Sequence, residues 1–185
     1  MNKTLWEKAR RQALVDYGID YKTKRETLVN SAVNYTTMLR VFKPRSKERI
    51  CRKLQEVLCK VKTTPYEKLH REFCHWFAAN IKRAKKYPPA SYGEAAKTFD
   101  VAMKFLVGFC RLPNERAAQR LMPKLHCGID RLTLRHLKSK CSSLVELDDR
   151  GYKELQTLLN QEASGELPVV YDEVLRQRLL RAHRN

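Results

Sequence analysis

Apolar residues recur at helical spacing along much of the chain, and this periodicity limits the fold more than any other feature of the sequence. Three successive segments each carry such a stripe: Leu28, Ala32, Tyr35 and Leu39; Ile50, Leu54, Val57, Leu58 and Val61; Leu69, Phe73, Trp76, Phe77 and Ile81. Stripes of this kind are typical of amphipathic helices that bury one face. No alternating pattern of useful length predicts a strand. The sequence therefore predicts an all-α fold.

Helix start signals divide the chain further. The pattern Ser/Thr-x-x-Glu, which satisfies two backbone amides at a helix start, occurs at 23–26, 64–67, 91–94 and 143–146. The first three predict helices that run to about Arg40, Lys85 and Cys110, and the fourth predicts a shorter helix. Further helices are expected over 4–16, 114–121, 149–163 and 171–183, and after Asp130. We expect residues 1–185 to form a single domain, a compact bundle of about eight or nine helices, with the terminal helices packed around residues 91–140.

Positive charge is in large excess and is concentrated in the first three quarters of the chain. The net charge is +18, and residues 1–90 carry 22 Lys and Arg against 8 Asp and Glu, whereas residues 142–185 carry 6 against 8. A net charge of about 2 to 8 usually suffices for solubility. A partner that carries phosphates explains the excess better, because binding releases the counterions of the phosphates.

Two short basic segments are the candidate nucleic-acid-binding surface. Their cations are Arg45, Lys47, Arg49, Arg52, Lys53, Lys82, Arg83, Lys85 and Lys86. We expect DNA rather than RNA as the ligand. A helical module that binds an acidic protein is the alternative explanation of the same charge.

The chain lacks features of secreted and membrane proteins. No stretch of about 18 apolar residues is present, and the first residues lack the apolar core of a signal peptide. The six cysteines lie mostly on apolar stripes, where a reduced thiol behaves as a small hydrophobe. These features predict an intracellular, cytoplasmic protein in a reducing compartment, with no membrane partner.

Cysteine and histidine spacing predicts no metal site. His70, Cys74 and His75 lie close together on one predicted helix, and His126 and Cys127 could join them in the folded chain. Structural zinc needs paired ligands such as Cys-x2-4-Cys, which are absent. We interpret the group as a partly buried cluster of aromatic rings and sulfur beside Trp76. Glycine-rich phosphate loops are absent too, so no cofactor is expected.

Two short motifs within residues 91–140 carry a resemblance to a known family. Gly93 to Val101 (GEAAKTFDV) enters a predicted helix, and Ile129 to Arg135 (IDRLTLR) opens another. Together they resemble the core of the helix-hairpin-helix DNA base-excision glycosylases, which act in DNA repair. The resemblance implies a DNA glycosylase or abasic-site lyase in which Lys97 is the Schiff-base nucleophile. Asp130 would assist departure of the base and stabilise the charged sugar.

Both residues also have ordinary structural roles open to them. Asp130 could be a helix N-cap that only satisfies backbone amides. Lys97 could be an exposed lysine that pairs with Asp100 or Glu94. Our main hypothesis is therefore a nucleic-acid-binding helical protein, with the glycosylase or lyase as the enzymatic alternative.

Overall fold

The computed structural model describes residues 2–84 and 89–182, and these residues contain nine α-helices and no strand. The predicted all-α class and the expected number of helices are therefore confirmed. Among the described residues, every helix is too short or too polar to reach across a lipid bilayer.

The α-helices differ in length and are connected by short loops and turns. In chain order they are α1 (Asn2–Asp16), α2 (Arg25–Tyr35), α3 (Ser46–Lys60), α4 (Tyr66–Asn80), α5 (Tyr92–Met103), α6 (Glu115–Leu121), α7 (Arg131–His136), α8 (Asp149–Ala163) and α9 (Pro168–Ala182). Three other helical segments are the 3-10 helices η1 (Met38–Val41) and η3 (Met122–Lys124) and the π-helix η2 (Lys104–Phe109).

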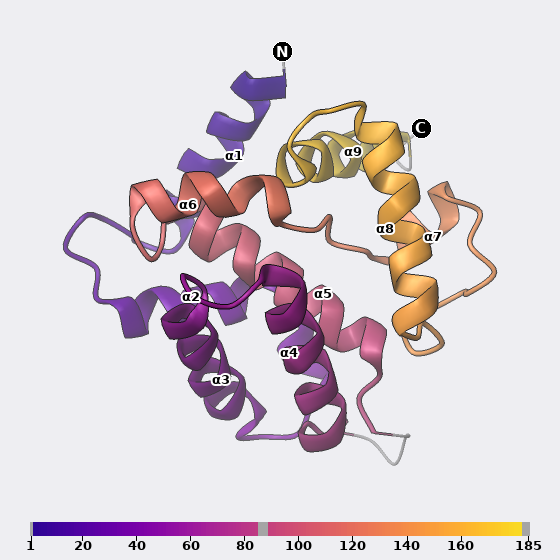
Figure 1. Cartoon of the computed structure of the whole chain (residues 1–185), viewed down its shortest axis with the longest axis horizontal. Helices are drawn as coiled ribbons and strands as arrows, with labels where there is room; N and C mark the ends of the chain where they lie inside the picture. The colour runs from indigo at the N-terminus through magenta and orange to yellow at the C-terminus, as the bar shows by residue number, and fades with distance from the viewer. Residues whose placement is uncertain (1, 85–88, 183–185) are drawn as a thin grey trace.

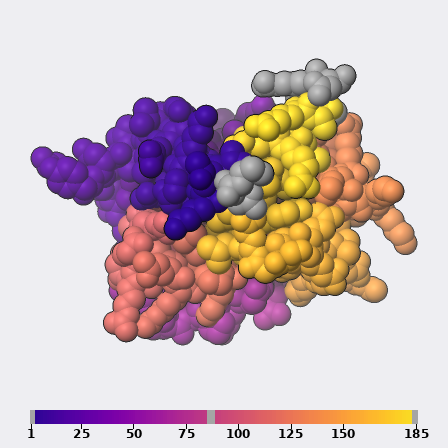
Figure 2. Space-filling view, turned by 90° about the horizontal axis from the view of Figure 1, so that it is seen from above, coloured from indigo at the N-terminus to yellow at the C-terminus, as the bar shows by residue number. Residues whose placement is uncertain are grey.

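The centre of the molecule is α5 together with η2. Nine of the residues of α5, among them Phe99 and Met103, are buried, and so is every residue of η2. Helices α2, α4 and α8 pack against α5, while α1 packs against η2 (Figure 1). A helix that is apolar nearly all round needs neighbours on every side, and this one has them. The first and the last helix lie side by side, because α1 packs against α9 (Figure 2).

The π-helix η2 continues α5 without a break. Its wider turns are closed by bonds such as that from the N–H of Cys110 to the carbonyl of Phe105, at 2.9 Å. Trp6 of α1 packs closely on Gly108, where an added Cβ would lie only 2.9 Å from the indole ring. Glycine at this position therefore lets α1 approach the central helix.

One of the four predicted capping boxes is present. Ser91 accepts a hydrogen bond from the N–H of Glu94, whose carboxylate accepts one from the N–H of Ser91. The boxes predicted at 23–26 and 64–67 are wrong, because Thr23 bonds to Asp20 instead, and α4 begins after Pro65 without a side-chain cap. Serine and threonine side chains can form other local hydrogen bonds, as Thr23 does, and these compete with capping.

The fourth predicted box is wrong for a related reason. The carboxylate of Glu146 accepts hydrogen bonds from the backbone N–H and hydroxyl of Ser142, which closes a turn rather than opening a helix. Helix α8 begins at Asp149, and Asp148 caps it by accepting from the N–H of Gly151 at 2.8 Å. The short helix expected after residue 143 is therefore absent from the described residues.

Two predicted helices end earlier than expected. Helix α2 stops at Tyr35 because Thr37 adopts a left-handed conformation with φ of 57°, and only the 3-10 helix η1 follows. Helix α4 stops at Asn80, since the next residues pair with the chain near Phe42 instead. The predicted extension of this helix to Lys85 ends outside the described residues.

Candidate functional site

An antiparallel bridge brings together the two basic segments that the sequence singles out. Phe42 pairs with Arg83, and the N–H of Lys43 donates to the carbonyl oxygen of Lys82 at 2.9 Å. The start of α3 and the end of α4 therefore lie close together, at the lower edge of Figure 1. Cations that are far apart in the sequence thus share one end of the molecule.

Two of the predicted binding residues hold helices together. Arg49 of α3 donates to the backbone carbonyl and the side-chain oxygen of Asn80, at 2.7 and 3.0 Å. Arg83 forms an ion pair of 3.0 Å with the buried carboxylate of Glu94 at the start of α5. Both cations have structural partners, so they are weaker candidates for phosphate contacts than the sequence suggested.

The remaining candidates divide according to their contacts. Lys53 pairs with Glu56 at 2.9 Å. Four others form no ion pair with a carboxylate of the described residues, and we call them the first basic cluster: Arg45, Lys47, Arg52 and Lys82. Lys85 and Lys86 lie outside the described residues.

A second group of cations was missed by sequence reasoning. It lines a groove between the end of α3 and α6 that has no carboxylate among its lining residues. We call it the second basic cluster: Lys62, Arg116, Arg120 and Lys124. Arg45 lies at the start of α3 and Lys62 just beyond its end, so the two clusters together extend along a helix of 15 residues, about 22 Å long. The i,i+4 spacing of Arg116 and Arg120 could have indicated that these two cations share a helix face. That Lys62 lies beside them could not be predicted, because it depends on how α3 and α6 pack.

Lys97 and Asp130 line the same pocket. The pocket has a volume of about 130 Å³, and Thr36, Thr37 and Arg176 also contribute to its wall. Lys97 comes from the second turn of α5, and Asp130 is the N-cap of α7. The fold therefore brings together the two residues that the resemblance paired.

The environment of Lys97 differs from that of an exposed lysine. Burial lowers the pKa of its amine, Asp130 opposes that shift, and the positive charges of Arg176 and Arg40 add to it. Lys97 does not pair with Glu94 or Asp100. Glu94 forms an ion pair with Arg83, and Asp100 lies beside His70. A half-buried amine of lowered pKa can act as a nucleophile more readily than an ordinary lysine.

Asp130 does have the structural role that its sequence position allowed. Its Oδ1 accepts hydrogen bonds from the N–H groups of Leu132 and Thr133, at 2.8 and 3.0 Å. Capping and pocket lining are thus combined in one carboxylate. The cap fixes the position of Asp130 at the pocket wall.

Lys104 and Asp172, which also line this pocket, belong to a buried ion triad. The amine of Lys104 contacts Asp172 at 2.6 Å and Glu173 at 3.3 Å, and all three residues are buried. Although burial lowers the pKa of Lys104, the negative charges of Asp172 and Glu173 raise it above its ordinary value. Lys104 therefore stays charged and links η2 to α9.

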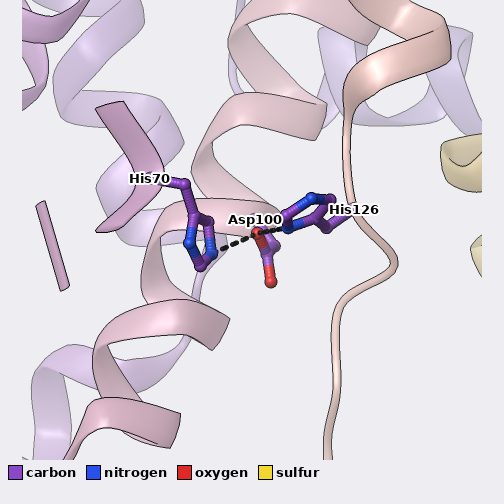
Figure 3. Close-up of side chains that lie close together, drawn as sticks. All are labelled: His70, Asp100 and His126. Atoms are coloured by element: carbon purple, nitrogen blue, oxygen red, sulfur yellow. Dashed lines mark ion pairs between the residues drawn. The ribbon is translucent and has the colours of Figure 1, made fainter. Parts of the chain in front are cut away.

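A second polar site also involves α5, where two histidines flank one buried aspartate (Figure 3). Asp100 Oδ1 lies 3.3 Å from Nε2 of His70 and 3.9 Å from Nδ1 of His126. His70 comes from α4, Asp100 from α5 and His126 from the loop before α7. We call these three residues the histidine–aspartate cluster.

Neighbouring polar groups hold the cluster in place. Tyr152 of α8 donates to Asp100 Oδ2 at 2.7 Å, and its hydroxyl lies 2.8 Å from His126 Nδ1. His126 Nε2 lies 2.8 Å from Glu67. Burial lowers the pKa of His126, but the hydrogen bond to Glu67 and the charge of Asp100 outweigh this effect and raise it.

The structure corrects the sequence interpretation of this region. His70 packs against the rings of Tyr152 and Phe99 rather than beside Trp76, and Cys74 Sγ lies 3.8 Å from its Nδ1. His75 is exposed, and the thiol of Cys127 donates to a backbone carbonyl. Asp100 was overlooked, although a carboxylate within an otherwise apolar helix is a signal for a buried polar partner.

Comparisons with protein-family models, with curated proteins and with solved structures give no match for this chain. The fold and its two polar sites are therefore the basis for any statement about function.

Proposed function

We propose that this protein binds nucleic acid, DNA in preference to RNA, along α3. The observation that carries the proposal is a set of cations along α3, in the first and second basic clusters, that form no ion pair with a carboxylate of the described residues. All of them except the half-buried Lys47 are exposed. Such cations gain free energy from phosphate contacts because condensed counterions are released. A spacing of about 22 Å suits contacts to phosphates of one duplex.

The test is the salt dependence of duplex DNA binding, measured by fluorescence anisotropy. Three triple variants are compared: Arg45→Gln/Arg52→Gln/Lys82→Gln, Arg116→Gln/Arg120→Gln/Lys124→Gln, and a control of equal charge change at the exposed residues Arg150, Arg178 and Arg181. Loss of three phosphate contacts is expected to lower the slope of log K against log salt by about 2.7.

The control should keep the slope of the unmodified protein, and duplex RNA of the same sequence should bind more weakly than DNA. An affinity that does not change with salt rejects the proposal. Equal losses in all three variants reject the assignment of binding to the two clusters, because they would reflect net charge alone.

A second candidate function is cleavage at abasic sites in DNA, for which the shared pocket of Lys97 and Asp130 is the specific support. The neutral amine would attack the sugar aldehyde carbon, water would leave, and the resulting iminium would promote loss of the 3′ phosphate. Asp130 would stabilise the positive charge. The small pocket requires that the sugar be rotated out of the duplex.

Borohydride trapping tests this candidate, because hydride reduces the iminium to a stable covalent adduct. The unmodified protein should give an adduct with abasic-site DNA, Lys97→Ala should give none, and the exposed-lysine control Lys153→Ala should give the full yield. Absence of an adduct, or an undiminished yield with Lys97→Ala, excludes Lys97 as the nucleophile.

A further inference from the structure

We propose that His70, Asp100 and His126 bind a divalent transition-metal ion between α4, α5 and the loop before α7. Their three donor atoms lie within 4.8 Å of one another. Two imidazole nitrogens and one carboxylate oxygen form a donor set that suits Zn²⁺ or Fe²⁺. This site is separate from the basic clusters and from the Lys97 pocket, so it does not rest on the proposed function.

Asp100 supplies an independent sign of a missing ligand. Its Oδ1 is buried, faces both imidazoles (Figure 3), and accepts no hydrogen bond of acceptable geometry from the described residues. An unsatisfied buried carboxylate oxygen is costly. A cation between the rings would satisfy it.

Metal binding would require the three donor atoms, now within 4.8 Å of one another, to move closer together. Ligands about 2.0 Å from a tetrahedral metal ion lie about 3.3 Å apart. The contact between His70 Nε2 and Asp100 Oδ1 already has this length, 3.3 Å. His126 Nδ1, at 3.9 Å from the same oxygen, must move closer, and its side chain belongs to a loop rather than a helix.

Hydrogen bonds from surrounding residues orient the proposed ligands, as is usual at metal sites. Metal-binding histidines commonly donate their other N–H to a carboxylate, which fixes the ring orientation. Glu67 stands in that position beside His126 Nε2, at 2.8 Å, and Tyr152 holds the second oxygen of Asp100. The Tyr152 hydroxyl also lies 2.8 Å from His126 Nδ1, and binding of a metal ion by this nitrogen would replace that contact.

The site has a route to solvent. A pocket of about 270 Å³ is lined by His70, His126, Tyr92, Tyr152 and Glu67. A metal bound by three protein ligands would keep a further position open to this pocket, as catalytic rather than structural ions do. The structure thus assigns a metal centre that can accept water or a small ligand.

The experiment measures metal binding by the full-length protein. After chelator treatment and dialysis, Zn²⁺ is titrated calorimetrically, and Co²⁺ is added separately to record its visible absorption. One equivalent of Zn²⁺ should bind. Asp100→Asn and His126→Gln should reduce the affinity at least tenfold, and Glu67→Gln by about tenfold, the usual effect of losing such a supporting contact.

The matched control is His136→Gln, because His136 also lies 2.9 Å from a glutamate but at the surface. This variant should bind Zn²⁺ as the unmodified protein does. Circular dichroism establishes which variants fold, and Glu67, with a side chain 71% exposed, can be replaced without disturbing the core. Failure of the unmodified protein to bind one equivalent overturns the proposal. An undiminished affinity in folded Asp100→Asn overturns it as well.

Discussion

Replacing Lys104 with methionine is expected to lower the free energy of unfolding by about 3–5 kcal/mol. The substitution keeps the length of the side chain but removes the charge that Asp172 and Glu173 share, at 2.6 and 3.3 Å. Two buried carboxylates then lack their cation, and α9 loses its link to the central helix. Urea denaturation followed by circular dichroism measures the change.

The control is Lys153→Met at an exposed pair. Lys153 contacts Asp149 at 2.8 Å one helical turn away, and its side chain is 59% exposed, so its loss should cost about 0.3–0.5 kcal/mol. Adding Asp172→Asn and Glu173→Gln to Lys104→Met should recover part of the lost stability, because the stranded charges disappear. Equal effects of the two lysine substitutions would contradict the structural role of the triad.

Replacing Phe99 with alanine should also destabilise the fold by about 3–5 kcal/mol. Phe99 is fully buried in α5. The centroid of its ring lies 4.8 Å from that of Phe73, 5.2 Å from that of His70 and 5.8 Å from that of Tyr66. Removal of the ring leaves a cavity and loosens the contact between α4 and α5. Thermal and urea denaturation both report the loss.

Tyr21→Ala is the control for the loss of an aromatic ring. Tyr21 is 90% exposed, and its removal should change stability by about 0.5 kcal/mol or less. A Phe99→Ala protein as stable as this control would show that the packing around α5 has been misassigned.

The fold class could be predicted because helical periodicity is a local property. Ile50, Leu54 and Leu58 face the core as their spacing requires. Helix ends were less predictable, because Thr23 and Glu146 each have a hydrogen-bond partner outside the predicted capping box. A choice between two local hydrogen bonds of similar strength is decided by the rest of the fold.

The candidate sites, too, could be predicted only in part. The sequence paired Lys97 with Asp130, and the two residues do line one pocket. It also noted His70 and His126, but it considered Asp100 only as a possible partner of Lys97 on the same helix. Its actual partners come from three other parts of the chain, and such distant contacts have no signature in a single sequence.

The π-helix η2 determines how the protein would respond to the deletion of one codon in this segment. A π turn holds about one residue more than an α turn, so deletion of a single codon between Lys104 and Phe109 would favour an ordinary α-helix. The residue removed is the extra one of the π turn, so the helix on either side of it would keep nearly its present orientation. Lys104 precedes the deletion and would still face Asp172. The same deletion inside α4 would instead rotate every later residue of that helix by about 100°. Loss of one codon is therefore expected to be tolerated better in η2 than in the α-helices around it.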